Sequence, residues 1–350
     1  MIGAGGMAGV WIRNFLPRFR DRLEIAGLVD VNPEALKSSG DFLGLAPSSR
    51  FADMESAFEK VEADFCIVVV PPAFHKEAVL RAVRRGMDIL SEKPIADTWK
   101  STCEIYRAVK GAGVRMAVIQ NYRYTPRILT LKKALREAEL GRILYIVARF
   151  GADYRVRYSW GKFRHEIPHT LVVEGSIHHF DQLRNLAGSD CRAIGGLDWN
   201  PGSPSFDGEC CALYFIEMES GVRAMYEGSC LAAGAQNEWH GEYYRIECEN
   251  GVATVGADQK VRVVRHKGKG LLSVDEIPME QPPVQGHQAI IEAFLDWLDG
   301  GAPPETVLDD NIKSAAMLFG AVRASDTRSV VDVAAMIAEA TGAGKESGSR

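Results

Sequence analysis

The 350-residue sequence lacks any run of about 20 apolar residues, the length that a membrane-spanning helix requires. It also lacks a basic segment and an apolar stretch ahead of its first structural motif, so we expect no secretory signal. Positive charge is not in excess: 46 acidic residues outnumber 41 basic ones, and a net charge of −5 gives no general attraction to nucleic acids or anionic membranes. We therefore expect a cytoplasmic protein that binds neither.

Cysteine shows no disulfide or metal-binding pattern. The seven cysteines are an odd number, and no two have the C-x-x-C spacing. Cys66 lies in an apolar run, and Cys210 and Cys211 would point to opposite faces of a strand. We expect small, buried side chains in a reducing compartment, and no bound metal.

Glycine, in contrast, is concentrated at the start of the chain. Residues 3–8 read GAGGMA, the G-x-G-x-x-A form of the dinucleotide-binding fingerprint. The first two glycines allow a tight turn and a close approach to a diphosphate, and a helix that begins near Met7 directs its N–H groups at the phosphates. An apolar run ends in Asp30, 22 residues beyond Ala8, where an acid can bind both ribose hydroxyls of NAD and repel the 2′-phosphate of NADP. We therefore expect NAD to be bound by Gly3, Gly5, Gly6, Met7, Ala8 and Asp30.

The first strand of this domain is short. Only Met1 and Ile2 precede the loop, whereas strands usually have about 5–6 residues. We expect residues 1–3 to occupy the remainder of a central strand, between the strands near 25–29 and 64–70. We also expect the natural chain to begin before Met1.

Continuous apolar runs alternate with helical stretches through residue 120, a pattern typical of parallel strands buried on both faces. The runs lie at 24–30, 64–70, 87–91 and 114–120, with helices at about 75–85 and 97–112. We predict an α/β Rossmann domain, a doubly wound parallel sheet, over residues 1–122. Such sheets bind ligands at the carboxyl ends of their strands.

The pattern changes after Asn121. A helix is expected from Thr125 to Gly141, and turns such as Asn250-Gly251 link the strand-like segments that follow. These segments lie at 143–153, 191–199, 209–218, 222–232, 243–249, 252–256 and 260–265, with further helices at 171–187, 286–299 and 309–325. We predict an α+β domain over residues 123–335 with a large, mostly antiparallel open sheet, followed by a disordered tail over 342–350.

A lysine follows the fourth strand, in the tripeptide Glu92-Lys93-Pro94. At the carboxyl end of a strand it would lie beside the nicotinamide, whose positive charge favours the neutral amine. A neutral amine can accept a proton, so Lys93 is a candidate general base. Taken alone, the tripeptide also fits an ordinary surface turn.

The motifs in combination resemble the glucose–fructose oxidoreductase / inositol dehydrogenase / MocA (Gfo/Idh/MocA) family. The loop, Asp30, Val70-Pro71-Pro72 with His75 and Glu92-Lys93-Pro94 occur in the family's order. Residues 121–126 (NYRYTP) resemble its segment between domains, and residues 174–181 (EGSIHHFD) resemble its acid-x-G-x-H-x-x-D helix. The resemblance covers nearly the whole chain.

This resemblance implies hydride transfer between NAD and a secondary alcohol of a sugar or cyclitol. It implies an open sheet that joins copies of the chain as a homodimer or homotetramer. It also implies that the Lys93–Pro94 bond is cis. The nicotinamide half of the cofactor would be bound by Pro71, His75, Glu92, Lys93 and Asn121.

The helix expected at 171–187 carries the second group of candidate catalytic residues. At 100° per residue, Glu174, His178 and Asp181 fall within about 60° of one another. His178 is a natural proton carrier, and Glu174, where the family usually has Asp, could orient its ring. A solvated helix face is the alternative. His179 points elsewhere, which predicts either a structural role or support for the site without contact to substrate.

Cations and aromatic rings are dense in residues 153–165, just before this helix. Guanidinium groups bind carboxylates or sulfonates, and aromatic faces suit sugar rings. A solvated loop could have the same composition. If the loop closes over a cleft, Arg155, Arg157, Lys162 and Arg164 can bind an anionic sugar. The substrate contacts we expect are Lys93, Arg123, Tyr154, Arg155, Arg157, Trp160, Arg164, His178 and Asp181.

We therefore expect an NAD-dependent dehydrogenase that acts on a secondary hydroxyl of a sugar, sugar acid or cyclitol. Lys93 and His178 would take the hydroxyl proton. One alternative is an NAD-dependent glycoside hydrolase that oxidises the sugar ring transiently. Another is a non-catalytic regulator that senses dinucleotides, which would be expected to lack the lysine or the histidine.

Overall fold

The computed structural model describes residues 1–234, 239, 241–270 and 272–342, which form two compact units. Unit 1 contains Met1–Asn121 and Gly286–Ile312, and unit 2 contains the rest. The sequence-based division placed residues 286–312 in the second domain, whereas in the structure these residues pack with unit 1. The segment packs into unit 1, where the ring of Phe294 lies 5.5 Å from that of Phe65 and the amide of Val118 donates to Thr306 O (3.0 Å). The expected tail at 343–350 lies outside the described residues.

Unit 1 contains a parallel sheet. Strand β1 (Leu28–Val29) pairs with β2 (Arg50–Phe51), and β3 (Phe65–Val68), β4 (Asp88–Ser91) and β5 (Met116–Val118) pair in that order. These strands are almost entirely buried, which explains why the sequence shows continuous apolar runs rather than alternation.

Ile2 joins the two parts of this sheet. It forms parallel bridges to Val29 of β1 and to Val68 of β3. Its amide donates to Ile67 O (2.8 Å), and its carbonyl accepts from the Val69 amide (2.9 Å). Residues 1–3 thus occupy the central position between the two predicted strands. The resulting order, β2-β1-Ile2-β3-β4-β5, is that of a complete six-stranded Rossmann sheet, and the predicted fold class is confirmed.

The helices of unit 1 connect these strands. Asn32 caps α2 (Pro33–Phe42) by accepting from the amides of Glu34 and Ala35, and Thr98 caps α5 (Trp99–Ala112). The other helical segments are α1 (Gly6–Val10), η1 (Trp11–Phe15), η2 (Leu16–Phe19), η3 (Pro47–Ser49), α3 (Met54–Lys60), η4 (Pro72–Phe74), α4 (His75–Arg84) and α9 (Gly286–Leu298).

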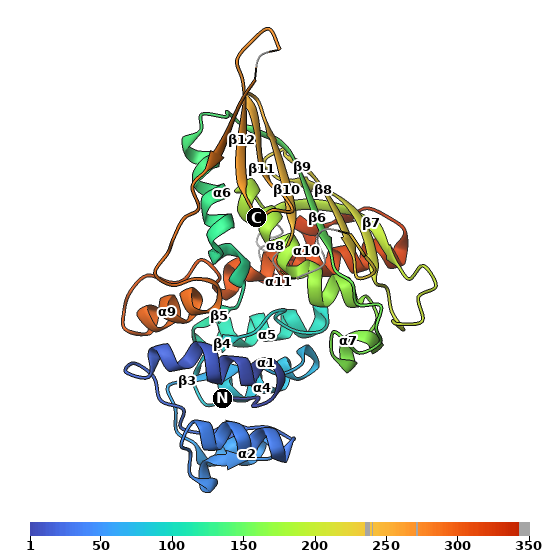
Figure 1. Cartoon of the computed structure of the whole chain (residues 1–350). Helices are drawn as coiled ribbons and strands as arrows, with labels where there is room; N and C mark the ends of the chain where they lie inside the picture. The colour runs from blue at the N-terminus through green and yellow to red at the C-terminus, as the bar shows by residue number, and fades with distance from the viewer. Residues whose placement is uncertain (235–238, 240, 271, 343–350) are drawn as a thin grey trace, which may run out of the picture. The chain divides into compact units, whose positions relative to one another are not determined.

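Unit 2 is built on one large sheet, whose strands lie side by side in Figure 1. The strand order is β13-β12-β11-β10-β6-β9-β8-β7-β14, and the pairing of β6 with β9 is the parallel one among otherwise antiparallel pairs. The strands are β6 (Ile143–Gly151), β7 (Cys191–Trp199), β8 (Cys211–Met218), β9 (Arg223–Ser229), β10 (Tyr243–Cys248), β11 (Gly251–Val255), β12 (Val261–His266), β13 (Leu272–Ile277) and β14 (Val331–Asp332). The predicted open, mostly antiparallel sheet is confirmed.

Helices cover one face of this sheet. Helix α6 (Pro126–Glu137) packs on β11 and β12, α8 (Ile177–Ala187) on β6, and α11 (Val333–Thr341) on β7. The remaining helical segments are η5 (Asn121–Tyr124), α7 (Lys162–Glu166), η6 (Leu171–Ser176) and α10 (Leu308–Thr327). Along β8 and β9 the side chains alternate between buried and exposed, and the exposed ones include Leu213, Phe215 and Met225. The second face of the sheet therefore presents apolar side chains to solvent.

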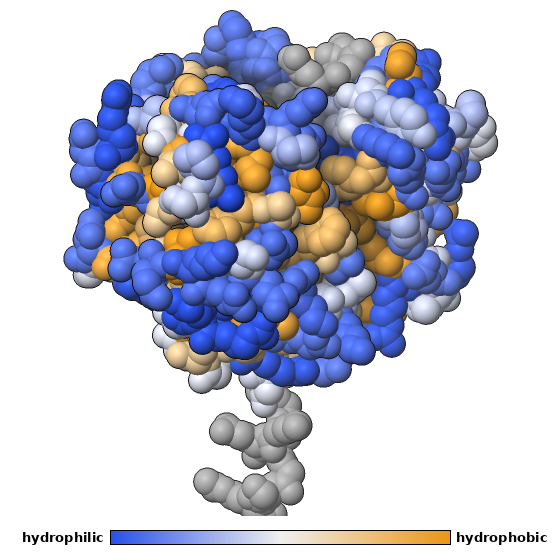
Figure 2. Space-filling model, turned by 90° about the horizontal axis from the view of Figure 1, so that it is seen from below, coloured by the Kyte–Doolittle hydropathy of each residue, from blue (hydrophilic) through white to orange (hydrophobic). Residues whose placement is uncertain are grey.

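Exposed apolar side chains are not confined to this sheet. Figure 2 shows one face of the molecule, on which a band of apolar side chains is bordered by polar ones. Exposed apolar side chains alone therefore do not identify an interface. The regular alternation of buried and exposed apolar side chains along β8 and β9 is the stronger indication of one. Among the described residues, no helix is both long and apolar enough to cross a membrane.

Candidate active site

The glycine loop adopts a conformation that requires glycine. Gly3 has φ +105°, and a Cβ atom at this position would lie 2.0 Å from Val69 O. Gly6 has φ +49° with open space around its Cβ direction. The backbone can therefore turn sharply and present N–H groups toward a ligand at the start of α1, as a dinucleotide diphosphate requires.

Asp30 lies beside this loop, directly after β1. Its Oδ2 accepts from the amides of Ala4 (2.7 Å) and Gly5 (3.1 Å), and its Oδ1 accepts from Asn32 (2.8 Å). The carboxylate thus fixes the loop and retains lone pairs for ribose hydroxyls. The adjoining cavity of about 330 Å³ is lined by Ala4, Gly5, Gly6, Gly9, Val10, Arg13, Asn14, Ala35, Ser38 and Ser39.

Eight of the ten cavity residues were not predicted, and three of these eight form a hydrogen-bond network. Arg13 donates to Ser38 Oγ (2.9 Å) and to Ser39 Oγ (3.4 Å), and Ser39 donates to Ala4 O (2.7 Å). No sequence motif connects η1 with the second half of α2, so local spacing could not reveal this network. Met7, which the fingerprint includes, is partly exposed.

Lys93 follows β4 at the same end of the sheet as the glycine loop. Ser91 pairs with Val68, and Val68 with Ile2, so Lys93 and Gly3 both lie just beyond the carboxyl ends of parallel strands. One strand separates them, which corresponds to about 10 Å across the sheet. The Lys93–Pro94 bond is cis, as predicted.

Glu92 is buried and bound to residues far away in the sequence. It accepts from Trp11 Nε1 (2.9 Å), and its Oε1 lies 3.3 Å from Nε2 of His287, whose ring stacks on Phe15. Burial by itself would raise the pKa of Glu92, but the hydrogen bond and charge of His287, the charge of Lys93 and the Trp11 hydrogen bond together lower it. The predicted cofactor residue is thus an anion that anchors the turn, and its partners Trp11 and His287 were not foreseen.

His75 is fully buried at the start of α4 and connects two loops at this end of the sheet. Its Nε2 lies 2.8 Å from Val70 O, and its Nδ1 lies 2.8 Å from Pro94 O. A carbonyl oxygen only accepts hydrogen bonds, so the ring nitrogen that carries the proton donates to its carbonyl, and the tautomer decides which of the two it is. His75 therefore positions the segments that contain Pro71 and Lys93. Asn121, the last residue of unit 1, is also buried.

In unit 2, His178 lies on the first turn of α8, preceded by the π-helical segment η6. Its ring stacks on that of Tyr122, with centroids 4.2 Å apart and planes 7° from parallel. Trp239 approaches the imidazole edge-on at 6.3 Å. His179 turns away, with Nδ1 2.8 Å from the hydroxyl of Tyr226, so its expected structural role agrees with its contacts.

Arg123 and Asp181, both predicted to contact substrate, bind each other. Arg123 Nε and an Nη donate to the two oxygens of Asp181 at 2.8 and 2.5 Å, and Ser314 Oγ donates to Asp181 Oδ1 (2.7 Å). Asp181 is fully buried. The geometry brings these two residues together as a structural pair, and a substrate contact by Asp181 would require the pair to open.

The cations of residues 153–165 also have acidic partners. Arg155 pairs with Asp153 (2.6 Å), Arg157 with Asp207 (3.0 Å) and Arg164 with the buried Glu174 (2.8 Å). Lys162 lies 4.0 Å from Glu166. The sequence shows the cations as a cluster, whereas the structure divides them among separate ion pairs.

The aromatic residues of the same segment pack on one another. Tyr154 stacks on Trp160 at 5.0 Å with planes 3° apart, and Trp160 contacts Trp239 at 5.4 Å. Trp239 also approaches His178, so this aromatic group continues to the candidate catalytic histidine. Trp239 lies outside the predicted motifs and was missed for that reason.

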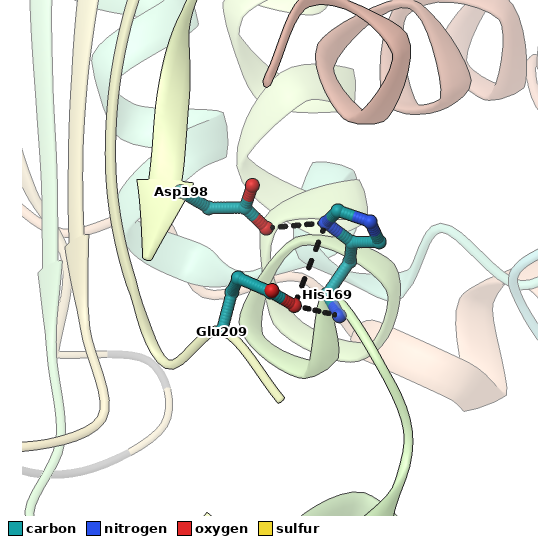
Figure 3. Close-up of side chains that lie close together, drawn as sticks. All are labelled: His169, Asp198 and Glu209. Atoms are coloured by element: carbon teal, nitrogen blue, oxygen red, sulfur yellow. Dashed lines mark hydrogen bonds and ion pairs between the residues drawn. The ribbon is translucent and has the colours of Figure 1, made fainter. Parts of the chain in front are cut away.

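One group of side chains in the described part of the chain could hold a cation. The candidate ligand atoms of His169, Asp198 and Glu209 all lie within 4.8 Å of one another (Figure 3). His169 Nδ1 is 2.9 Å from Asp198, and its Nε2 is 3.3 Å from Asp326. The hydrogen bond to Asp198, aided by the charges of all three acids, raises the pKa of His169 against the effect of burial. A protonated histidine explains the group equally well, so the absence of a bound metal stays a prediction.

Comparison with known proteins agrees with this geometry. Residues 1–120 match the Gfo/Idh/MocA oxidoreductase family with an NAD-binding Rossmann fold, and residues 132–333 match the family's C-terminal alpha/beta domain. Protein y4oX of Sinorhizobium fredii is 35% identical over 332 residues, which cover 92% of this chain and 91% of that protein. Inositol 2-dehydrogenase 4 of Saccharopolyspora erythraea is 26% identical, covering 95% of each chain.

Solved structures share the fold. An oxidoreductase from Agrobacterium radiobacter, crystallised with NAD⁺, L-tartaric acid and magnesium, superposes with a TM-score of 0.83 at 20% identity, over 96% of this chain and 98% of that chain. The protein is an oxidoreductase with an NAD-binding Rossmann domain. It belongs to the Gfo/Idh/MocA family, and the predicted family, enzyme class and cofactor are confirmed.

Proposed function

We propose that the protein oxidises a secondary hydroxyl group of a sugar, sugar acid or cyclitol. The observation that carries the proposal is the position of Lys93. It lies just beyond the carboxyl end of β4, and the central strand of the same sheet leads into the glycine loop. When bound, NAD⁺ supplies an acceptor for the hydride. The names of relatives support the substrate class, since they include D-apiose dehydrogenase, inositol 2-dehydrogenase 4 and levoglucosan dehydrogenase.

Lys93 takes the hydroxyl proton in this proposal. The amine accepts the proton as the carbon–hydrogen bond breaks, so that the alcohol becomes a ketone. His75 and Glu92 hold the turn around Lys93 through Pro94 O and through Trp11 and His287. These contacts are positioning interactions, because each acts on the backbone or on a neighbouring side chain rather than on substrate.

His178 of unit 2 serves the same transfer as a proton carrier. Glu174, paired with Arg164, lies one turn before it on η6. Asp181 and Arg123 support the helix through their buried pair. We assign His178 the direct role and the other residues the task of holding α8 and η6 in position.

The pairing of the arginines in residues 153–165 favours a neutral polyol over an anionic sugar as the substrate. Arg155, Arg157 and Arg164 each bind a carboxylate of this chain, which reduces the charge available to a substrate anion. An anionic substrate would have to displace one of these acids. The two substrate classes therefore form separate arms of the test.

The test is a screen of the purified protein with NAD⁺ against neutral sugars, sugar acids, cyclitols and glycosides, following both NADH and product mass. We expect NADH and a ketone from a neutral polyol, and Lys93→Ala should abolish turnover while NAD binding stays within about threefold. The matched control is Lys60→Ala, an exposed lysine on α3. NADH formation that survives Lys93→Ala would refute the role of Lys93. Glycoside cleavage without net NADH would favour the hydrolase alternative.

We also propose that the exposed face of the large sheet joins copies of the chain. The support is the outward row of Leu213, Phe215 and Met225 on neighbouring strands, where Phe215 pairs with Met225. Sedimentation of wild type and of Phe215→Glu measures this directly. A monomeric wild-type protein would refute the proposal.

A further inference from the structure

The imidazole ring of His178 stacks on the face of the Tyr122 ring. The two rings are nearly parallel, and the side chains are 3% and 7% exposed. At a centroid distance of 4.2 Å, the aromatic face is well within the range in which it attracts a cation. The contact is neutral when His178 is neutral, and it becomes a cation–π interaction when the imidazole takes a proton.

A buried ion pair fixes the position of Tyr122. Its hydroxyl hydrogen-bonds the carboxylate of Glu242, which is 1% exposed and paired with Arg127 of α6. Burial, first, and the charge of Glu242 raise the pKa of Tyr122 well above its ordinary value of about 10. The phenol therefore keeps its proton, remains a donor to Glu242, and offers a neutral ring with an electron-rich face.

Three acidic residues in the described part of the chain belong to the elements around His178, and each has a cationic partner. On its own helical segment, Glu174 is paired with Arg164 and Asp181 with Arg123. Ahead of β10, Glu242 is paired with Arg127 and lies 3.5 Å from Nε2 of His179. Each of these three acids thus has a cationic partner, and the ring of Tyr122 stacks directly on the imidazole.

We propose that Tyr122 is a positioning residue that stabilises the protonated form of His178, and that the Arg127–Glu242 pair holds Tyr122 in place for this role. The inference rests on the proposed function only where it concerns catalysis, because the stack itself can be measured without substrate. In turnover, the stack would favour the state in which His178 carries the proton that Lys93 has taken from the hydroxyl group, without contact between Tyr122 and the substrate.

The experiment is an NMR titration of the full chain labelled with ¹⁵N-histidine. The signal of His178 is assigned by its loss in His178→Gln, among the eight histidines of the chain. We expect its titration midpoint to fall by about 0.4–1.5 pH units in Tyr122→Leu, which removes the ring. Tyr122→Phe, which keeps the ring, should retain most of the wild-type midpoint. Tyr145→Leu, a partly exposed tyrosine on β6, is the control and should change nothing.

A second ring-deleting variant guards against misfolding. Tyr122→Met places a flexible side chain in the same space, and it should shift the midpoint in the same direction as Tyr122→Leu. A midpoint within 0.2 units of wild type in a folded ring-deleted variant would overturn the proposal, and so would an equal shift in Tyr122→Phe.

Kinetics separates this inference from the proposed function. On the best substrate, Tyr122→Leu should lower kcat about 10-fold or more and move the pH profile by the shift seen in NMR, with KM changed less than about threefold. A shifted titration with unchanged kcat would support the stack and refute the role of His178 in proton transfer. An unshifted titration would refute the stack whatever the kinetics show.

Discussion

Replacing Asp181 by Asn tests the energetics of the buried pair in unit 2. Asp181 is fully buried and accepts two hydrogen bonds from Arg123 and one from Ser314. The variant keeps the shape of the side chain but removes the charge that compensates a guanidinium whose side chain is 6% exposed. Loss of one partner of a buried pair costs about 3–5 kcal/mol, because the remaining charge stays desolvated.

The expected change is large enough to measure by thermal unfolding. For a unit of about 150–250 residues, each kcal/mol lowers Tm by roughly 2–4 °C, so Asp181→Asn should lower the Tm of unit 2 by roughly 6–20 °C. The double variant Arg123→Met/Asp181→Leu should recover most of this loss, because neither charge remains buried. Glu276→Gln, in the half-exposed pair with Lys260, is the control and should cost less than about 1 kcal/mol.

This reasoning would be refuted if the two variants, one in the buried pair and one in the exposed pair, lowered the free energy of unfolding by the same amount. If Asp181→Asn costs no more than Glu276→Gln, the charge of Asp181 does not compensate Arg123 in the folded protein. Circular dichroism melts without cofactor provide the measurement, and chemical denaturation provides an independent free energy of unfolding.

Three further predictions concern other parts of the chain. Asp30→Ala should narrow the preference for NAD over NADP, because the like charge that repels a 2′-phosphate is gone; calorimetric titration with both cofactors checks this, and an unchanged ratio contradicts it. The pKa of His169 is raised, so its ion pairs stabilise the fold fully below the ordinary pKa near 6.5, and this stabilisation is lost as the pH rises through the raised pKa. His169→Gln should therefore flatten the dependence of the unfolding free energy on pH between about 6 and 9. A slope equal to that of wild type would exclude this role. His287→Ala should lower kcat by about tenfold and change NAD affinity little, because the variant loosens Glu92 beside Lys93. Stopped-flow kinetics measures kcat, and a binding assay measures NAD affinity. A loss of NAD affinity would place His287 at the cofactor instead.

Features encoded by neighbouring residues could be predicted from the sequence. The glycine loop and Lys93 depend on a few consecutive positions, and the parallel strands appear as unbroken apolar runs. Strand β13 was missed because it lies at the edge of the sheet, where Leu272 and Val274 are exposed and alternate with polar residues. Such a segment has neither the apolar run nor the buried face that pattern analysis detects.

Partnerships across the chain could not be predicted. The cations Arg155 and Arg157 appeared available to a substrate, and their pairing with Asp153 and Asp207 depends on the fold. Trp11 and His287 meet at Glu92 although more than 270 residues separate them in the sequence. The charge and hydropathy of a residue can be read from the sequence, whereas the partner of a charge depends on the tertiary structure.

The bridges of Ile2 have a consequence for the exchange of backbone amides with solvent. The amides of Val29 and Val69 are protected by bonds to Met1 O and Ile2 O, so a local opening of these first residues would expose both halves of the sheet at once. The same opening would displace Gly3, whose amide donates to Val29 O (2.7 Å) and which begins the cofactor loop. A bound dinucleotide should therefore slow exchange at Val29 and Val69, because every opening that frees these amides must first release the ligand.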